Sequence, residues 1–117
     1  MNNRASSYCV ITLASSAMNV DIQAAFDAGV TAGIFEQTCY IFLLCEISDK
    51  KAIHTFLNDV KRNSSHFESL LPNNHLQWVN TLNVEPPVAA LEEHGIEQCT
   101  QKHYRETITH AHSLLQF

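Results

Sequence analysis

Charged residues are scarce in this chain, and basic residues are scarcer than acidic ones. Aspartate, glutamate, lysine and arginine make up 16% of the 117 residues, whereas about a quarter is typical of globular domains. Twelve of them are acidic and seven are basic, which gives a net charge of −5 with neutral histidines. Because contacts to a nucleic-acid backbone need clustered lysine and arginine, the sequence argues against a nucleic-acid partner.

Long apolar runs and paired cysteines are also missing. No uninterrupted apolar run reaches the ~20 residues of a membrane-spanning helix, so we expect no membrane partner. The stretch 8–14 is short and rich in β-branched residues, and we interpret it as a strand rather than a signal segment. None of the four cysteines forms a C-x-x-C pair, and Cys9, Cys39 and Cys45 lie inside apolar runs. This pattern predicts buried, reduced thiols in a cytoplasmic protein.

Motifs that carry catalysis are absent as well. The sequence has no G-x-S-x-G nucleophile elbow. Gly29 and Gly33 are not followed by the Lys-Ser/Thr pair of a phosphate-binding loop. We therefore expect a protein that is not an enzyme and that has no cofactor.

Apolar side chains, in contrast, make up 45% of the chain, which is enough for the core of one domain over 1–117. Periodicity and turn residues divide the sequence into elements. The predicted strands are 8–14, 30–35, 38–47 and 76–84. The predicted helices are 20–29, which would end at Gly29, then 49–60, a short one after the Pro86–Pro87 pair, and a long one from Ile96 to Leu115.

The order β-α-β-β-α-β over 8–84 predicts an α+β fold of the ferredoxin-like, split βαβ kind, with 85–117 as a C-terminal helical extension. In this layout the chain resembles the small regulatory and ligand-sensing folds of the ACT, PII-like and dimeric α+β-barrel kinds. The alternative is that the first helix continues through Gly29 to Phe35. The chain would then have three strands in a βαβ-type arrangement.

Both faces of the strand 38–47 are apolar. One face carries Cys39, Ile41, Leu43, Cys45 and Ile47, and the other carries Tyr40, Phe42 and Leu44. Both faces should therefore be buried, although the helices of a ferredoxin-like sheet cover only one. The C-terminal helix or a second subunit must cover the other. The low charge favours a subunit, so we predict a homodimer whose interface includes Tyr40, Phe42, Leu44 and Trp78.

The stretch "CTQKHYRETITHAH" at 99–112 concentrates potential metal ligands. On a helix from Ile96, four of them fall within roughly a 60° arc; they are Cys99, His103, Glu106 and His110. A straight helix cannot surround a tetrahedral ion with all four groups, so we predict no bound metal and keep this set as the fallback candidates.

These observations favour a small regulatory or adaptor module that acts through protein–protein interaction, with a small ligand as a modulator. One alternative is an acidic inhibitor or immunity-type protein that blocks a basic active site, because complementary charge speeds association. A second alternative is a metal-binding protein built on the stretch 99–112.

Overall fold

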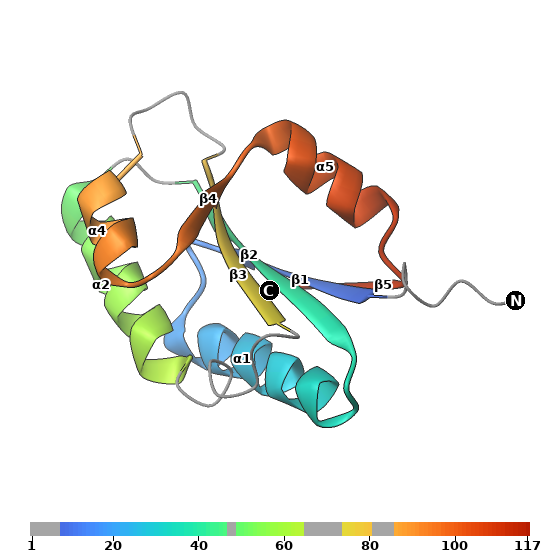
Figure 1. The fold of residues 1–117 in the computed structure, drawn as a ribbon. Helices are drawn as coiled ribbons and strands as arrows, with labels where there is room; N and C mark the ends of the chain where they lie inside the picture. Colours follow the sequence, from blue (N-terminus) through green and yellow to red (C-terminus); the bar gives the residue numbers. More distant parts are fainter. Residues whose placement is uncertain (1–7, 47–48, 65–73, 81–85) are drawn as a thin grey trace, which may run out of the picture.

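The computed structural model describes residues 8–46, 49–64, 74–80 and 86–117. Its centre is a five-stranded sheet with the strand order β4-β3-β2-β1-β5, in which every neighbouring pair is parallel (Figure 1). The strands are β1 Tyr8–Ala14, β2 Thr38–Cys45, β3 Asn74–Asn80, β4 Glu97–Cys99 and β5 Ser113–Gln116. The helices of the described residues are α1 Asn19–Ile34, α2 Lys50–Asn63, α4 Val88–Glu93 and α5 Gln101–Thr109.

Helices cover both faces of the sheet (Figure 1). Helices α1, α2 and α4 pack on one side, which we call the three-helix face, and α5 packs on the other, which we call the α5 face. Side chains alternate along the strands, so Ile11, Ile41 and Trp78 enter the core of the three-helix face. Val10 and Phe42 enter the core of the α5 face.

The predicted ferredoxin-like order is not what the sheet shows, because that order needs an antiparallel hairpin over 30–47 and every pairing is parallel. Residues 30–34 are the second half of α1, as in the alternative that continued the helix. Gly29 is buried inside this helix and does not end it. The helix ends at Ile34 with Phe35 as its C-cap, and Glu36, the next residue, has a left-handed φ of 57°. There the Glu36 and Gln37 amides donate to the carbonyls of Gly33 and Ala32, each at 2.9 Å.

The prediction of one long C-terminal helix from Ile96 to Leu115 is also wrong, because this segment forms a strand, a helix and a second strand. Thr100 caps α5 by accepting a hydrogen bond from the His103 amide at 3.1 Å. The chain then crosses the α5 face and pairs with β1, where the Phe117 amide donates to the Thr12 carbonyl at 2.8 Å. The segment predicted as a helical extension therefore contributes both edge strands of the sheet, β4 and β5.

Other sequence predictions are confirmed. The strand predicted at 8–14 is β1, and the two faces predicted for the strand 38–47 are the two faces of β2. The strand predicted at 76–84 corresponds to β3, and residues 81–84 lie outside the described residues. Cys9, Cys39 and Cys45 are buried thiols, and Cys99 is half-buried. No helix in the described residues combines the length and hydrophobicity needed to cross a bilayer.

Candidate functional site

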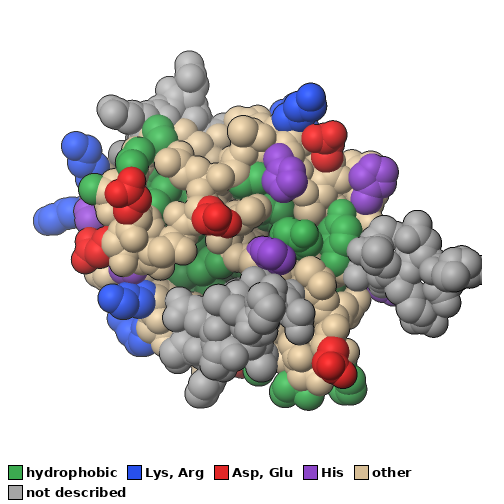
Figure 2. All heavy atoms as spheres, in the orientation of Figure 1, with side chains coloured by type: hydrophobic (Ala, Val, Ile, Leu, Met, Phe, Trp, Pro, Cys, Tyr) green, Lys and Arg blue, Asp and Glu red, His purple; other side chains and the backbone are tan. Residues whose placement is uncertain are grey.

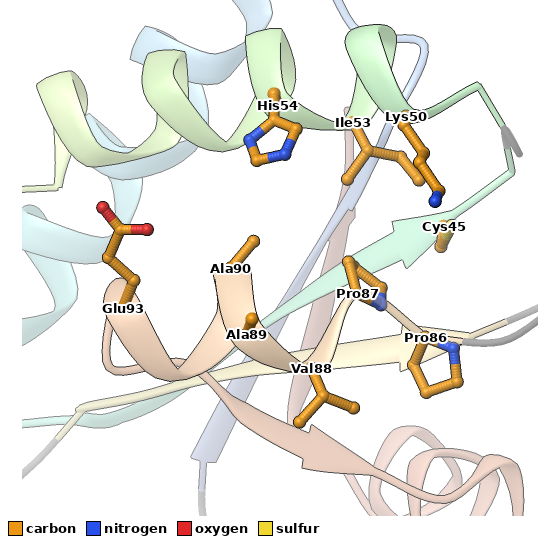
Figure 3. Close-up of a pocket in the computed structure, with 10 residues that line it drawn as sticks. All are labelled: Cys45, Lys50, Ile53, His54, Pro86, Pro87, Val88, Ala89, Ala90 and Glu93. Carbon is orange, nitrogen blue, oxygen red and sulfur yellow. The ribbon is translucent and has the colours of Figure 1, made fainter.

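One hollow lies where the chain leaves β2 and enters α4. It is a cavity of about 430 Å³ between the first turns of α2 and the short helix α4 (Figure 3). Helix α2 contributes Lys50, Ile53 and His54, and Cys45 lines it from the end of β2. The remaining lining residues come from α4 and the two residues before it, Pro86, Pro87, Val88, Ala89, Ala90 and Glu93. We call this cavity the α2–α4 pocket.

Local sequence explains how both walls form. Helix α2 is strongly amphipathic and buries Ile53, Phe56, Leu57 and Val60 against the sheet. Its first turn therefore presents Lys50 and His54 at the border between core and solvent. Opposite, Pro87 is the N-cap of α4, and the Leu91 amide donates to the Pro87 carbonyl at 3.0 Å. Proline suits a helix start because the first amides have no partner within the helix.

The pocket has a cation at one end and an anion at the other. Figure 3 shows the Lys50 amine near the end of β2, the Glu93 carboxylate at the far end of α4, and the His54 ring between them on the α2 side. Asp49, the N-cap of α2, makes no side-chain capping hydrogen bond. The positive end of the α2 dipole and Lys50 together favour a negative group at that end of the pocket.

A second hollow of about 320 Å³ lies beside the first half of α2, at the end of β1. Ser15, Ser16 and Ala17 line one side of it, and Ala52, Thr55, Phe56 and Asp59 line the other. The Ser15 hydroxyl is already engaged, since it accepts a hydrogen bond from the Glu46 amide at 2.8 Å. This bond ties the ends of β1 and β2 together, so the second hollow offers fewer free polar groups than the first.

The structure places the predicted interface residues in two groups. Phe42 and Trp78 are both 0% exposed within this chain. Tyr104 of α5 covers Phe42 edge-on, with ring centroids 5.0 Å apart, and Trp78 packs near Phe56 in the three-helix core. Neither side chain reaches a surface that a partner could contact. Tyr40 and Leu44 are half-buried on the α5 face, and their part in an interface stays a prediction.

Apolar side chains reach the surface together with isolated charges on the side seen in Figure 2, and histidines lie among them. The ring of His75 stacks on that of Tyr40, with centroids 4.6 Å apart. Tyr8 meets Tyr40 edge-on at 5.1 Å and donates a hydrogen bond from its hydroxyl to the Thr107 carbonyl at 2.7 Å. The aromatic side chains therefore form a continuous seam between the sheet and α5.

The metal-ligand candidates do not lie on one helix. Cys99 ends β4, His103 and Glu106 are exposed on α5, and His110 is the C-cap of that helix. Burial raises the pKa of the Cys99 thiol, with a smaller opposing effect of a backbone hydrogen bond from Tyr104. A protonated thiol is a poor metal ligand. Among the described residues, no group of three or more histidine, cysteine or acidic side chains is placed to hold a metal ion.

Sequence reasoning missed the α2–α4 pocket, and its residues Lys50, His54 and Glu93 carry no motif. The available signal was topological, because ligands of parallel sheets bind beyond the carboxyl ends of the strands. The predicted antiparallel order hid that signal. Comparisons with protein-family models, with curated proteins and with solved structures find no match for this chain.

Proposed function

We propose that this protein is a non-enzymatic regulatory module that binds a small organic anion in the α2–α4 pocket and acts through a protein partner, a second copy of itself. The observation that carries the proposal is the position of the pocket. It lies beyond the carboxyl end of β2 in a parallel sheet, where such folds bind their ligands. Its volume of about 430 Å³ falls within the range of ligand sites, roughly 300–1,000 Å³.

The lining defines the class of ligand. Lys50 and the start of α2 favour a carboxylate or phosphate at one end. Ile53, Val88 and Ala89 supply an apolar wall for a hydrocarbon body. Glu93 at the other end accepts a hydrogen bond from an amine or hydroxyl. An elongated molecule with an anionic head, an apolar middle and a donor at its tail matches all three regions.

The same lining supports binding rather than catalysis. Catalysis by a thiol needs a base within hydrogen-bond reach of the sulfur. Cys45 is buried at the end of β2, and Figure 3 shows it well apart from His54. The pocket groups therefore suit recognition, and the proposed outcome of binding is a tighter contact between α2 and α4.

The proposed partner surface is the outer edge of β5, which ends the sheet on that side. Leu114 is 42% exposed and Leu115 is 49% exposed, and they project to opposite faces because they pair with Val10 and Ile11. Edge strands usually carry charges or proline that block pairing, and Ser113–Gln116 carries neither. A second copy offers the same uncharged edge, so two β5 strands can continue one sheet across a two-fold axis.

The ligand proposal is tested by thermal melting with a panel of aliphatic and aromatic carboxylates and phosphates. At least one compound should raise the melting temperature of the parent protein. Lys50→Ala should lose that shift, whereas Lys51→Ala should keep it, because Lys51 is the next residue on the same helix and does not line the pocket. The proposal fails if no compound stabilises the parent, or if both variants lose the shift equally.

The partner proposal is tested separately by size-exclusion chromatography with light scattering at tens of micromolar. The parent should be dimeric, and Leu115→Lys should be monomeric with unchanged circular dichroism. Val20→Lys is the matched control, since Val20 is 67% exposed and belongs to the start of α1 rather than to the β5 edge. A monomeric parent, or a dimer that survives Leu115→Lys, contradicts the proposed edge.

A further inference from the structure

Two cysteines lie side by side at the end of the sheet opposite the α2–α4 pocket. Cys9 on β1 and Cys39 on β2 are direct partners in the parallel register. Both side chains enter the three-helix core, where Cys39 is 0% exposed and Cys9 is 8% exposed. Cys9 therefore has a small contact with solvent, whereas Cys39 has none.

The backbone geometry at this pair is close to that of a disulfide. Neighbouring strands lie about 4.7–4.9 Å apart, and disulfides join Cα atoms about 4.4–6.8 Å apart. The Cβ atoms of a disulfide must approach to about 3.5–4.5 Å, so the strands have to tighten locally. A bond made under such strain is more easily reduced than a structural disulfide. The pair suits reversible rather than permanent oxidation.

The two thiols differ in pKa and in exposure to solvent. The interaction between the two thiols lowers the pKa of Cys9 and raises that of Cys39. Burial opposes the effect at Cys9 and adds to it at Cys39. The thiolate is the reactive form of cysteine. Because Cys9 is the one of the two that contacts solvent, we assign it the attacking role and Cys39 the resolving role.

We propose that Cys9 and Cys39 are a modification site, a dithiol that a hydroperoxide converts reversibly to a disulfide. The Cys9 thiolate attacks one peroxide oxygen, the O–O bond breaks, and the leaving oxygen is released as water or an alcohol after taking up a proton. The Cys39 sulfur then attacks the sulfur of the Cys9 sulfenic acid, and the hydroxyl leaves as water with the Cys39 proton. Two thiols lose two electrons, and the hydroperoxide gains them.

The other two cysteines lie too far away to compete. Cys45 is at the opposite end of β2, six residues from Cys39, which corresponds to about 20 Å along a strand. Cys99 is on β4 and packs on the α5 face, whereas Cys9 and Cys39 are on the three-helix face. Intramolecular oxidation should therefore join Cys9 to Cys39 and leave Cys45 and Cys99 as thiols.

The bond would also change the stability of the protein. It would close a segment of about 30 residues that contains α1, and closing such a segment restricts the unfolded chain. After subtracting strain, we expect the oxidised protein to favour the folded state on the order of a hundred-fold more than the reduced protein does. Reaction with peroxide would thus attach α1 more rigidly to the sheet.

The test is intact-mass spectrometry after treatment with hydrogen peroxide. The Cys45→Ala/Cys99→Ala variant should lose about 2 Da as a monomer, as two thiol hydrogens leave, and dithiothreitol should reverse the loss. Cys9→Ala/Cys39→Ala, which keeps the other two cysteines, should show no such loss. In the parent protein, digestion with chymotrypsin, which cleaves at Tyr40 and Phe42, separates Cys39 from Cys45 and should yield a linked peptide of Cys9 and Cys39.

Because the parent protein supplies this last result, the test does not depend on folding of the variants. Sulfinic acid on Cys9 without any linked peptide would overturn the proposal, because it would show that Cys39 does not resolve the sulfenic acid. A linked peptide that contains Cys45 or Cys99 would overturn it as well. Urea unfolding of the oxidised and reduced parent should then show the hundred-fold difference.

Discussion

The two faces of the sheet are covered in different ways. On the three-helix face, α1, α2 and α4 bury large side chains such as Phe26, Leu57 and Trp78 almost completely. On the α5 face, the fully buried apolar side chains among the described residues are Val10, Phe42 and Val79, and half-buried residues surround them. One helix of nine residues cannot cover five strands, so the aromatic rings of Tyr8, Tyr40 and Tyr104 complete the cover. The comparison separates a deep core under three helices from a thin core under one helix.

This difference assigns different mechanical roles to the helices. The three-helix core holds the sheet together, because buried apolar area is the main stabilising contribution in a domain. Helix α5 is attached through a few ring contacts and the hydrogen bond from Tyr8 to Thr107. We expect α5 to open at a lower free energy than α1 or α2.

The largest effect should come from a charge placed in the thin core. Phe42→Asp should abolish the folded state, since burying an unpaired carboxylate costs several kcal/mol of the roughly 5–15 kcal/mol that stabilises a domain. Near-ultraviolet circular dichroism would show the loss of tertiary structure. Leu114→Asp is the control, because Leu114 is partly exposed on the same face and that variant should stay folded. A folded Phe42→Asp protein that only changes its oligomeric state would mean that Phe42 faces a partner.

The same truncation on each face compares the two cores directly. Phe26→Ala should lower the free energy of unfolding by about 4 kcal/mol and Phe42→Ala by about 3 kcal/mol. Both rings are essentially fully buried, but α5 can settle into the space left by Phe42, which reduces the cost of the cavity. Urea unfolding of both variants measures the difference. A larger loss for Phe42→Ala would reverse the assignment of the deep and thin cores.

Removing one hydroxyl should loosen α5 without disturbing the rest. Tyr8→Phe loses the hydrogen bond to the Thr107 carbonyl, which should lower stability by about 1 kcal/mol. Hydrogen exchange should accelerate at the amides of α5 and remain unchanged at those of α2. If exchange accelerates equally in both helices, α5 does not open independently, and the expected difference in opening free energy between α5 and α2 is wrong.

Alkaline pH should weaken the thin core selectively. Burial raises the pKa of Tyr104, and burial with repulsion from Tyr40 raises that of Tyr8, above the ordinary value of 10.0. The neutral phenols therefore stabilise the folded state fully below pH 10, and this contribution is lost as pH rises through the folded-state pKa values. Urea midpoints should fall above pH 10, and less steeply in Tyr104→Phe. An unchanged slope would indicate that Tyr104 does not sense burial in the folded state.

The smallest effect concerns only the three-helix side. Glu36→Gly should raise the free energy of unfolding by about 0.5 kcal/mol, because glycine adopts the left-handed backbone of this position without a steric cost. Hydrogen exchange at the amides of α1 should then slow, whereas exchange at the amides of α5 should stay unchanged. Glu46→Gly serves as a control for glycine as such, and a loss of stability in Glu36→Gly would show that its side chain outweighs the backbone strain.

The sequence predicted the three central strands, β1, β2 and β3, better than it predicted the connections and the edge strands. The alternation in 38–47 was sufficient to assign both faces of β2, because side-chain direction follows strand period without any tertiary information. The end of α1 was not predictable in the same way. Glycine at 29 is the usual signal for a helix end, yet the helix continues to Ile34, and the left-handed residue that follows its C-cap is Glu36, a residue type that does not indicate this conformation. Because the predicted helix ended too early, the sequence predicted a hairpin where the structure has a parallel crossover.

The candidate site depended on this boundary. Lys50, His54 and Glu93 come from two helices that are distant in the sequence, and only the parallel order brings the starts of α2 and α4 together. Cys9 and Cys39, in contrast, were correctly predicted as buried in strands. Their adjacency could not be predicted, because it depends on register between β1 and β2, which composition does not determine.

The pairing of β5 with β1 has a consequence for synthesis of the protein. Strand β1, the first strand of the described residues, hydrogen-bonds to residues 113–116, which are synthesised about a hundred residues later. Until then one edge of an apolar strand, Tyr8–Ala14, has no neighbour on that side within the described sheet. Such edges attract other nascent chains. Slow translation of the last third should therefore increase aggregation of newly made protein, although the finished sheet no longer exposes that edge.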